Sequence, residues 1–327
     1  MSAEAWPTTG IGGAAGNAAA AALAEELGYD SVWISEVNGP DAVTTMCGIA
    51  SRTKTITIAT GVMCIYLRDP LLMAMTANSL VDFAGRRLIL GLGTSTQVVV
   101  ELWHGLKWDH PLGKTESYVG LVRKLLAGER VKEDGLYRLS GAQMTSPANG
   151  QVPIFLGALN RKMLRLAGSI ADGVILNFPT LPYTRWAIEH IQQGIADAGR
   201  QRSDVNVTAF LRTTVTGEPA SAIPAYRAEL LTYVLSPVYR RVFTQDGYGE
   251  ACDAVNDKWA SGDRAGALAA LPDQVVLDHS VIGSETECRT RFQEFRHAGV
   301  DNAVVFAMPG GGGTESVMNT IRTLAGA

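Results

Sequence analysis

Glu36 is the first side chain whose type and position suit chemistry, because it ends the otherwise apolar segment SVWIS at 31–35. A carboxylate at the end of a buried strand accepts hydrogen bonds from a bound heterocycle and, when desolvated, acts as an acid or a base. The same position suits a structural role, in which the carboxylate caps the following helix. Glu36 is therefore our candidate for catalysis and ligand binding, with helix capping as the alternative.

A glycine-rich turn, GLGTST at 91–96, follows another apolar segment. It is similar to a dinucleotide-binding G-x-G-x-x-G loop, but Thr96 replaces the third glycine, so that interpretation is poor. A tight turn that presents backbone N–H groups and the hydroxyls of Thr94 and Ser95 to an anion or a heterocycle fits better. Ordinary turn chemistry is the alternative.

A third turn, GALN at 157–160, joins an apolar segment to a helix that we expect to begin near Arg161. The N–H groups at a helix N-terminus bind phosphate, and Asn160, Arg161 and Lys162 add donors and positive charge. This turn is a candidate phosphate site. The alternative is that Asn160 only caps the helix.

Histidines and cysteines form no recognisable ligand pattern. His104 and His110 are too far apart on an expected loop to bind one ion together, and the other histidines fall in helical or inserted segments. The four cysteines are widely spaced and contain no C-x-x-C pair. We expect no metal site, and we expect reduced, mostly buried thiols.

Composition excludes several classes of partner. The chain has 327 residues, of which 46% are apolar and 18% charged, and its net charge is −4. This mild acidic balance argues against a surface that neutralises nucleic acid. No apolar run approaches the roughly 18 to 20 residues of a bilayer span, and the first basic residue is Arg52, so the charged start of a secretory signal is missing. We expect a cytoplasmic protein that binds a small molecule, without nucleic-acid or membrane partners.

Helical segments alternate with short, nearly continuous apolar segments, which are typical of parallel strands buried on both faces. Eight such units predict an α/β fold of the (β/α)8 TIM-barrel type rather than an open doubly wound sheet. The expected strands lie at 31–35, 55–62, 87–92, 152–156, 173–176, 205–214 and 302–306, preceded by a short first strand somewhere in 6–12, and the expected helices include 17–27, capped by Asn17, 41–52 and 70–84. In a barrel of this type, the loops that follow the strands carry the function.

Two stretches exceed the repeating unit. The segment 131–144 is expected to form a small hairpin before strand five, turning at Asp134-Gly135. The segment 219–271 is expected to add a helical insertion between strand seven and its helix, within bounds of about 216–280. No linker or low-complexity tract interrupts the chain, so we expect one domain over 1–327.

Four segments together resemble the luciferase-like monooxygenase superfamily, and more closely its branch of oxidoreductases that use the deazaflavin coenzyme F420, which includes methylene-tetrahydromethanopterin reductases. They are LAEELGYDSVWISEV at 23–37, RTKTITIATGVMCIYLRDP at 52–70, GRRLILGLGTSTQVVVELWHG at 85–105 and VPIFLGALNRKMLRLAGSIADGVILNF at 152–178. The resemblance covers the chain almost end to end, with the motifs in the order and at the spacing of the family. It implies a (β/α)8 barrel and F420 as the cofactor, with FMN as the alternative.

The resemblance also implies roles for individual residues. The bulged third strand of the family often contains a non-prolyl cis peptide behind the deazaflavin ring, and the matching bond joins Gly61 to Val62. Glu36 matches an acid that hydrogen-bonds the ring, and the loop with Thr94 and Ser95 meets the ring or its side chain. The phosphate loop of the family matches Gly157, Ala158, Leu159 and Asn160.

The substrate side departs from the family. In a sugar-phosphate dehydrogenase of this branch a catalytic His follows the acid and a Glu lies in the strand-four loop, whereas this chain has Val37 and Thr96 there. Neither side chain exchanges a proton at neutral pH, so that sugar chemistry is not expected. We assign Val37, Thr96 and Asn177, which follows strand six, to the substrate side.

These observations predict hydride transfer between C5 of the deazaflavin and a small organic substrate. Reduction of an imine, an iminium ion or a conjugated alkene needs little acid-base help from the protein. The alternatives are an FMN-dependent monooxygenase on the same fold, and a non-catalytic homologue that binds a ligand. Luciferase-like barrels commonly pair through their helices, so the resemblance also implies a homodimer.

Overall fold

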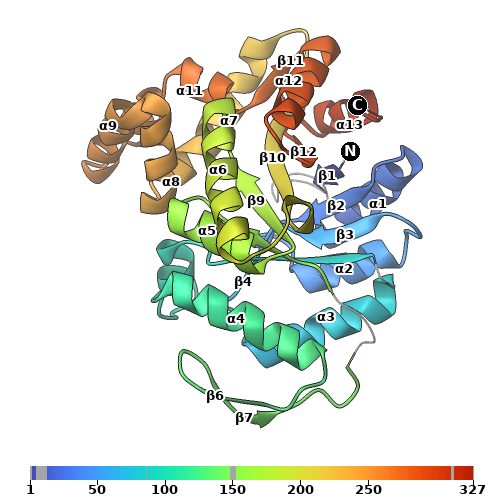
Figure 1. The fold of residues 1–327 in the computed structure, drawn as a ribbon. Helices are drawn as coiled ribbons and strands as arrows, with labels where there is room; N and C mark the ends of the chain where they lie inside the picture. Colours follow the sequence, from blue (N-terminus) through green and yellow to red (C-terminus); the bar gives the residue numbers. More distant parts are fainter. Residues whose placement is uncertain (1, 5–12, 86, 148–151, 311–312, 327) are drawn as a thin grey trace.

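A closed ring of eight parallel strands forms the centre of the computed structural model, which describes residues 2–4, 13–85, 87–147, 152–310 and 313–326 (Figure 1). In ring order the strands are β1 (Ser2–Glu4), β2 (Ser31–Ile34), β3 (Thr57–Thr60), β5 (Leu88–Gly93), β8 (Ile154–Gly157), β9 (Gly173–Asn177), β10 (Asn206–Val215) and β12 (Asn302–Ala307). The ring closes because β10 pairs with both β9 and β12, and β12 pairs with β1. The predicted (β/α)8 barrel is therefore confirmed.

The first strand lies earlier in the chain than the sequence predicted. β1 pairs in parallel with β12 and β2, so it completes the ring. The predicted segment, 6–12, lies outside the residues that the structure describes. The sequence signal failed because Ser-Ala-Glu has little intrinsic strand preference, and pairing with two neighbours fixes this segment instead.

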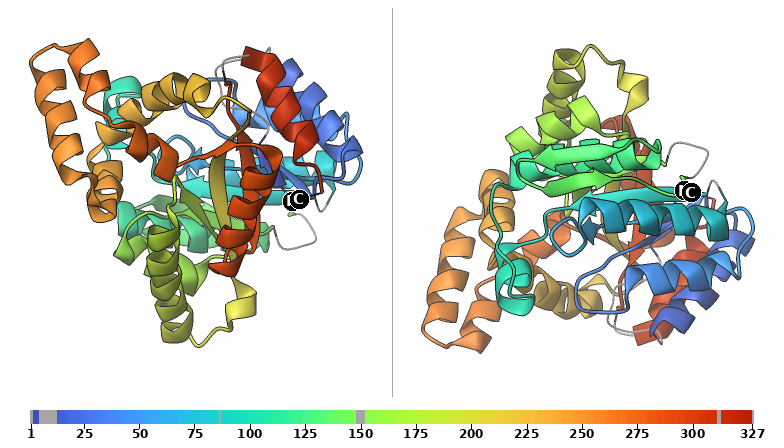
Figure 2. Two further views of the ribbon diagram at one scale, coloured as in Figure 1. Left: turned by 90° about the horizontal axis from the view of Figure 1, so that it is seen from above. Right: turned by 90° about the horizontal axis from the view of Figure 1, so that it is seen from below.

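Helices surround the barrel, as Figure 2 shows from above and from below. They are α1 (Gly13–Glu26), α2 (Ala42–Ala50), α3 (Pro70–Ala84), α4 (Pro111–Leu126), α5 (Arg161–Ile170), α6 (Leu181–Asp197), α12 (Glu285–His297) and α13 (Gly313–Thr323), with a short 3-10 helix at Arg202–Asp204. The main hydrophobic core lies between these helices and the strands. Asp41 caps α2 as its position predicted, but Asn17 is buried inside α1, because the alanine-rich sequence extends that helix toward its N-terminus.

The predicted hairpin is present before β8. Strands β6 (Val131–Asp134) and β7 (Arg138–Ala142) pair antiparallel, with Asp134 opposite Arg138. The hairpin projects away from the barrel next to α3 and α4 (Figure 1). It therefore lies apart from the insertion that follows β10.

The predicted helical insertion lies between β10 and α12. It contains α7 (Pro219–Val234), α8 (Pro237–Phe243), the π-helical turn η3 (Thr244–Tyr248), α9 (Gly249–Ala260), α10 (Arg264–Ala269), α11 (Asp273–Asp278) and the short strand β11 (Val281–Gly283). Its buried residues Tyr226 and Leu230 share a second hydrophobic core with Trp33, Phe155 and Phe210 of the barrel strands. Since β11 pairs with the last residues of β10, the insertion covers the C-terminal end of the barrel.

A series of hydrogen bonds between buried or partly buried groups connects this insertion to the barrel. The hydroxyl of Thr180, directly before α6, donates to one carboxylate oxygen of Asp246 at 3.0 Å. The other oxygen lies 3.1 Å from Nε2 of His279, whose Nδ1 lies 2.8 Å from the carbonyl oxygen of Val275. The contacts connect η3 and the end of α11 to the loop after β9. The insertion is therefore held in place over the barrel mouth.

No helix in the described part of the chain is both long enough and apolar enough to cross a bilayer.

Candidate active site at the barrel mouth

The third barrel strand is interrupted where it reaches the mouth. β3 ends at Thr60, the peptide between Gly61 and Val62 is cis, and the two-residue strand β4 (Met63–Cys64) then pairs with the end of β5. The cis bond is the one that the family resemblance predicted. A Cβ atom at Gly61 would lie 2.3 Å from the Phe210 ring, so only glycine fits there.

Val62 lies next to two glycines, of which Gly93 is too close to it to carry a side chain. A Cβ atom added to Gly93, at the end of β5, would lie 2.5 Å from Cγ2 of Val62. One added to Gly157, at the end of β8, would lie 3.4 Å from Cγ1 of the same valine. Three neighbouring strand ends therefore combine one apolar side chain with two positions that lack side chains, which suits a flat ring lying on Val62.

The loop after β5 has a left-handed residue at its tip. Ser95 has a φ of 54°, and the indole N–H of Trp108 donates to the carbonyl oxygen of Thr94 at 3.1 Å. The Thr96 hydroxyl lies 3.4 Å from the backbone N–H of Val99, at the start of the π-helix η1 (Val98–Trp103). Thr94, Ser95 and Thr96 are all partly buried. Thr96 thus has a local structural contact, and Thr94 is fixed through its backbone.

The loop after β8 leads directly into α5. The Asn160 side chain accepts a hydrogen bond from Met163 N–H at 3.1 Å, so its capping role is present. The Ala158 N–H donates to the β9 carbonyl of Ile175 at 3.2 Å, and the Tyr183 hydroxyl donates to the carbonyl oxygen of Leu159 at 2.7 Å. The first turn of α5 carries exposed Arg161 and Lys162. Since the first N–H groups of a helix have no partner within it, this end suits an anion.

Glu36 forms an ion pair that the sequence analysis missed. Its two oxygens accept hydrogen bonds from the Arg68 guanidinium at 2.6 and 3.0 Å, and Oε1 also accepts from Ala42 N–H at 3.1 Å. Burial opposes the charge of Arg68, but Glu36 and Asp41 outweigh it and raise the pKa of that guanidinium. Asp41 lies 3.0 Å from Arg68. Through Ala42, Glu36 also binds the first N–H group of α2, whose N-cap is Asp41. Two occupied oxygens suit orientation of a ligand better than proton transfer.

A second polar network lies on the opposite side of the mouth. At the end of β9, Asn177 accepts a hydrogen bond from the Arg212 guanidinium through Oδ1 and donates from Nδ2 to the Tyr239 hydroxyl at 2.8 Å. Arg212 also donates from Nε and Nη2 to Oε1 of Glu229, both at 3.2 Å. The network therefore joins β9 and β10 to α7 and α8. Of these residues, Asn177 is the one that the sequence assigned to the site.

Arg212 is almost completely buried, with 2% of its surface exposed. Its guanidinium lies over the Phe178 ring at 3.7 Å and over the Phe306 ring at 3.8 Å, in contacts that favour a cation. Oε2 of Glu229 is also buried and has no hydrogen-bond partner among the described residues. The available sequence signal was the single basic residue in the strand segment NVTAFLRTTV at 206–215.

Burial and its neighbours act in opposite directions on Tyr239. Burial raises the pKa of its hydroxyl, whereas the Asn177 hydrogen bond and the Arg212 charge lower it, and the net shift is upward. The Tyr239 hydroxyl is therefore protonated at neutral pH. Because it accepts a hydrogen bond from Asn177, its own proton is available to another acceptor.

The remaining predicted residues have different surroundings. Val37 follows Glu36 but is exposed to solvent, with 43% of its surface accessible.

In the described part of the chain, no three His, Cys, Asp or Glu side chains are arranged to hold a metal ion. The described strand ends therefore bring together a Glu36–Arg68 side, a glycine-lined centre and an Asn177–Arg212–Tyr239 side.

Comparison with known proteins identifies relatives of the whole chain. A family model described as luciferase-like monooxygenase matches residues 2–302. The chain is 32% identical over 288 residues to a 5,10-methylenetetrahydromethanopterin reductase of Methanolobus tindarius, and the match covers 87% of each protein. Its identity to the reductase of the same name from Archaeoglobus fulgidus is 30% over 288 residues, with 86% of each covered.

A solved structure shows the same fold. The coenzyme F420-dependent tetrahydromethanopterin reductase from Methanopyrus kandleri superposes with a TM-score of 0.83 at 22% sequence identity, over 100% of this chain and 97% of that one. The full-length structural match and the sequence matches point to the same group of proteins. The chain belongs to the luciferase-like monooxygenase family.

Proposed function

We propose that this protein is an F420-dependent oxidoreductase that transfers a hydride between C5 of the deazaflavin and a small organic substrate, in the direction of imine or conjugated C=C or C=N reduction. The observation that carries the proposal is the interrupted third strand, which places Val62 between Gly93 and Gly157 at the barrel mouth. The two named reductases among its relatives support the reaction class. A glycine-lined centre with an apolar floor suits a flat tricyclic ring.

The residues at the mouth fit this cofactor. Val62 would lie behind the ring, Thr94 and Ser95 would meet its edge, and the loop from Gly157 to Asn160 would hold the phosphate at the start of α5. Glu36, fixed by Arg68, would orient the ring from the opposite side. When bound, F420 supplies the hydride. The contribution of the protein is to align two flat partners and to exclude water between them.

The polar network around Asn177 provides a proton donor where the family histidine and glutamate positions are Val37 and Thr96. We assign donation to Tyr239, because its hydroxyl is protonated and accepts from Asn177. Hydride addition to an imine carbon leaves a basic nitrogen, which takes this proton. Val37 and Thr96 then contribute to the walls of the substrate site rather than to proton transfer.

A binding titration followed by fluorescence tests the cofactor. Purified protein is titrated with F420 and, separately, with FMN. Affinity for F420 in the micromolar range or tighter, with no FMN binding, is the expected result. FMN binding alone would replace the proposal with the monooxygenase alternative, and tight F420 binding without any turnover would favour a non-catalytic homologue.

Glu36→Ala is expected to weaken F420 binding by about tenfold, because it removes an orienting carboxylate and leaves Arg68 without its bidentate partner. The same titration measures the loss. Glu36→Gln serves as the control for shape, since it keeps the side-chain volume and one acceptor oxygen. Unchanged affinity in the alanine variant would remove Glu36 from the cofactor site.

We also propose that the protein is a homodimer that pairs through α3. Leu72, Met75 and Phe83 lie on the outer face of this helix with 44%, 49% and 62% of their surfaces exposed. An apolar stripe of this kind on a surface helix is typical of an interface. Phe83→Lys is expected to give a monomer by sedimentation velocity, whereas Leu136→Lys, on the exposed hairpin tip, leaves the dimer intact. A monomeric wild-type protein at micromolar concentration would contradict the proposal.

The single domain and the cytoplasmic location expected from the sequence remain predictions.

A further inference from the structure

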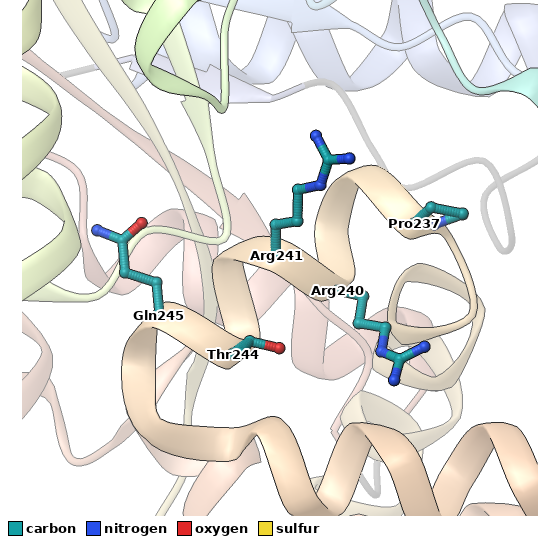
Figure 3. A pocket seen from close by; sticks show the side chains of 5 residues that line it. All are labelled: Pro237, Arg240, Arg241, Thr244 and Gln245. Atoms are coloured by element: carbon teal, nitrogen blue, oxygen red, sulfur yellow. The ribbon is translucent and has the colours of Figure 1, made fainter.

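A cavity of about 460 Å³ lies on the insertion (Figure 3). Its volume is within the range of small-ligand pockets. Its lining side chains all come from α8 and η3: Pro237, Arg240, Arg241, Thr244 and Gln245. They provide two guanidinium groups, a hydroxyl and an amide, and the lining contains no acid. Because Asp253 of α9 neutralises Arg240, the uncompensated positive charge of this lining is that of Arg241, which suits an anion.

The two arginines differ in their present contacts. Arg240 forms an ion pair with Asp253 of α9, which holds its guanidinium in position. Arg241 is exposed, and no acid among the described residues forms an ion pair with it. Figure 3 shows Arg241 and Gln245 extending from one side of the helical segment, and Arg240 and Thr244 from the other. Arg241 is therefore the cation that is available to an incoming carboxylate or phosphate.

The cavity is held close to the barrel mouth. α8 is fixed there by the Tyr239 hydroxyl, which accepts from Asn177. η3 is fixed there as well, because its Asp246 accepts a hydrogen bond from the Thr180 hydroxyl in the loop after β9 at 3.0 Å. The exposed Arg161 and Lys162 of α5 extend the positive charge toward the mouth.

We propose that this cavity binds a carboxylate or phosphate group on a flexible arm of the ligand that occupies the barrel mouth. The inference rests on the proposed function, because it assumes that an anionic ligand occupies that mouth. Two sources share this chemistry. One is the side chain of F420, whose glutamyl carboxylates extend beyond the phosphate assigned to the Gly157–Asn160 loop, and the other is a carboxylate or phosphate on an arm of the substrate. A guanidinium recognises either group through paired N–H donors.

The test starts from the protein without cofactor. Tri-γ-glutamate and, separately, inorganic phosphate are titrated while the arginine Nε–H signals are followed by NMR, in wild type, Arg241→Gln and Arg264→Gln. Arg264 is the matched control, because it is an exposed arginine of the same insertion that stacks on Trp259 instead of lining the cavity. Arg241→Gln is expected to weaken binding of at least one probe by about 3-fold to 10-fold, with a smaller effect at high salt.

Equal affinity in wild type and Arg241→Gln would overturn the proposal, as would an equal loss in the Arg264 control. A second titration compares F420 with its deazaflavin-ribitol precursor, which lacks the phosphate and the glutamates. A loss for F420 alone in Arg241→Gln identifies the cofactor arm. Unchanged affinity for both, together with weaker probe binding, identifies a substrate arm. The probe titrations need no cofactor. A protein that does not bind F420, which would contradict the proposed function, is therefore distinguished from one whose cavity does not bind an anion.

Discussion

Tyr239→Phe is expected to slow the reduction of an imine or enone by reduced F420 about 10²-fold to 10⁴-fold, the usual range for removal of a general acid. The variant loses only the hydroxyl that accepts from Asn177 at 2.8 Å. The affinity for F420 is expected to stay within about twofold, because none of the proposed cofactor contacts involves this hydroxyl. The experiment combines single-turnover kinetics, with 2-methyl-1-pyrroline and cyclohexenone as probe substrates, and a cofactor titration.

The direction of the hydrogen bonds explains the effect. Arg212 donates to Oδ1 of Asn177, so the amide is oriented with Nδ2 toward Tyr239. The tyrosine oxygen is then an acceptor in this bond, and its proton remains free to move to a substrate. The same amide and the Arg212 charge stabilise the phenolate that is formed, since both lower the pKa of Tyr239 against the larger upward effect of burial.

The pH profile gives a second measurement. Because the net shift of the Tyr239 pKa is upward, the donor is protonated through the neutral range, and the rate in wild type is expected to be flat between about pH 6 and pH 9. Tyr248→Phe is the matched control, since that hydroxyl donates to Asp278 within the insertion. A full rate in Tyr239→Phe with an unchanged solvent isotope effect would assign the proton to water.

Arg212→Met is expected to lower the free energy of unfolding by about 3 to 5 kcal/mol, the usual cost of removing one partner of a buried ion pair. The substitution leaves the largely buried Glu229 carboxylate without its counter-charge, although its Oε2 already lacks a hydrogen-bond partner. It also removes the cation that lies between the Phe178 and Phe306 rings. Urea unfolding followed by circular dichroism measures the change.

The double variant Arg212→Met/Glu229→Gln separates charge from packing. Neutralising the carboxylate is expected to recover part of the loss, so the double variant is more stable than Arg212→Met alone. Additive losses from the two substitutions would show that the ion pair is not the main contribution. A loss below about 1 kcal/mol in Arg212→Met would contradict the interpretation of this arginine as a buried, paired cation.

Local sequence patterns were sufficient to predict most of the barrel. Strands such as β2 and β10 are continuous apolar or β-branched segments, because parallel strands are buried on both faces. The hairpin was predicted from its Asp-Gly turn, and the insertion from the length of chain between β10 and α12. β1 was misplaced because its three residues have little intrinsic strand preference. They form a strand because they pair with β12 and β2.

The sequence by itself determined most of the elements, the three loops that follow strands at the mouth and, through the family resemblance, the cis bond at Gly61. Only the tertiary structure decided which side chains meet there. Arg68 is 32 residues from Glu36, and Tyr239 is 62 residues from Asn177, and the members of each pair lie on different elements. Closure of the ring and the register of its strands bring such residues together, and neither is encoded by local periodicity. The hydrogen-bond and ion-pair partners of such buried polar side chains are therefore known only from the tertiary structure.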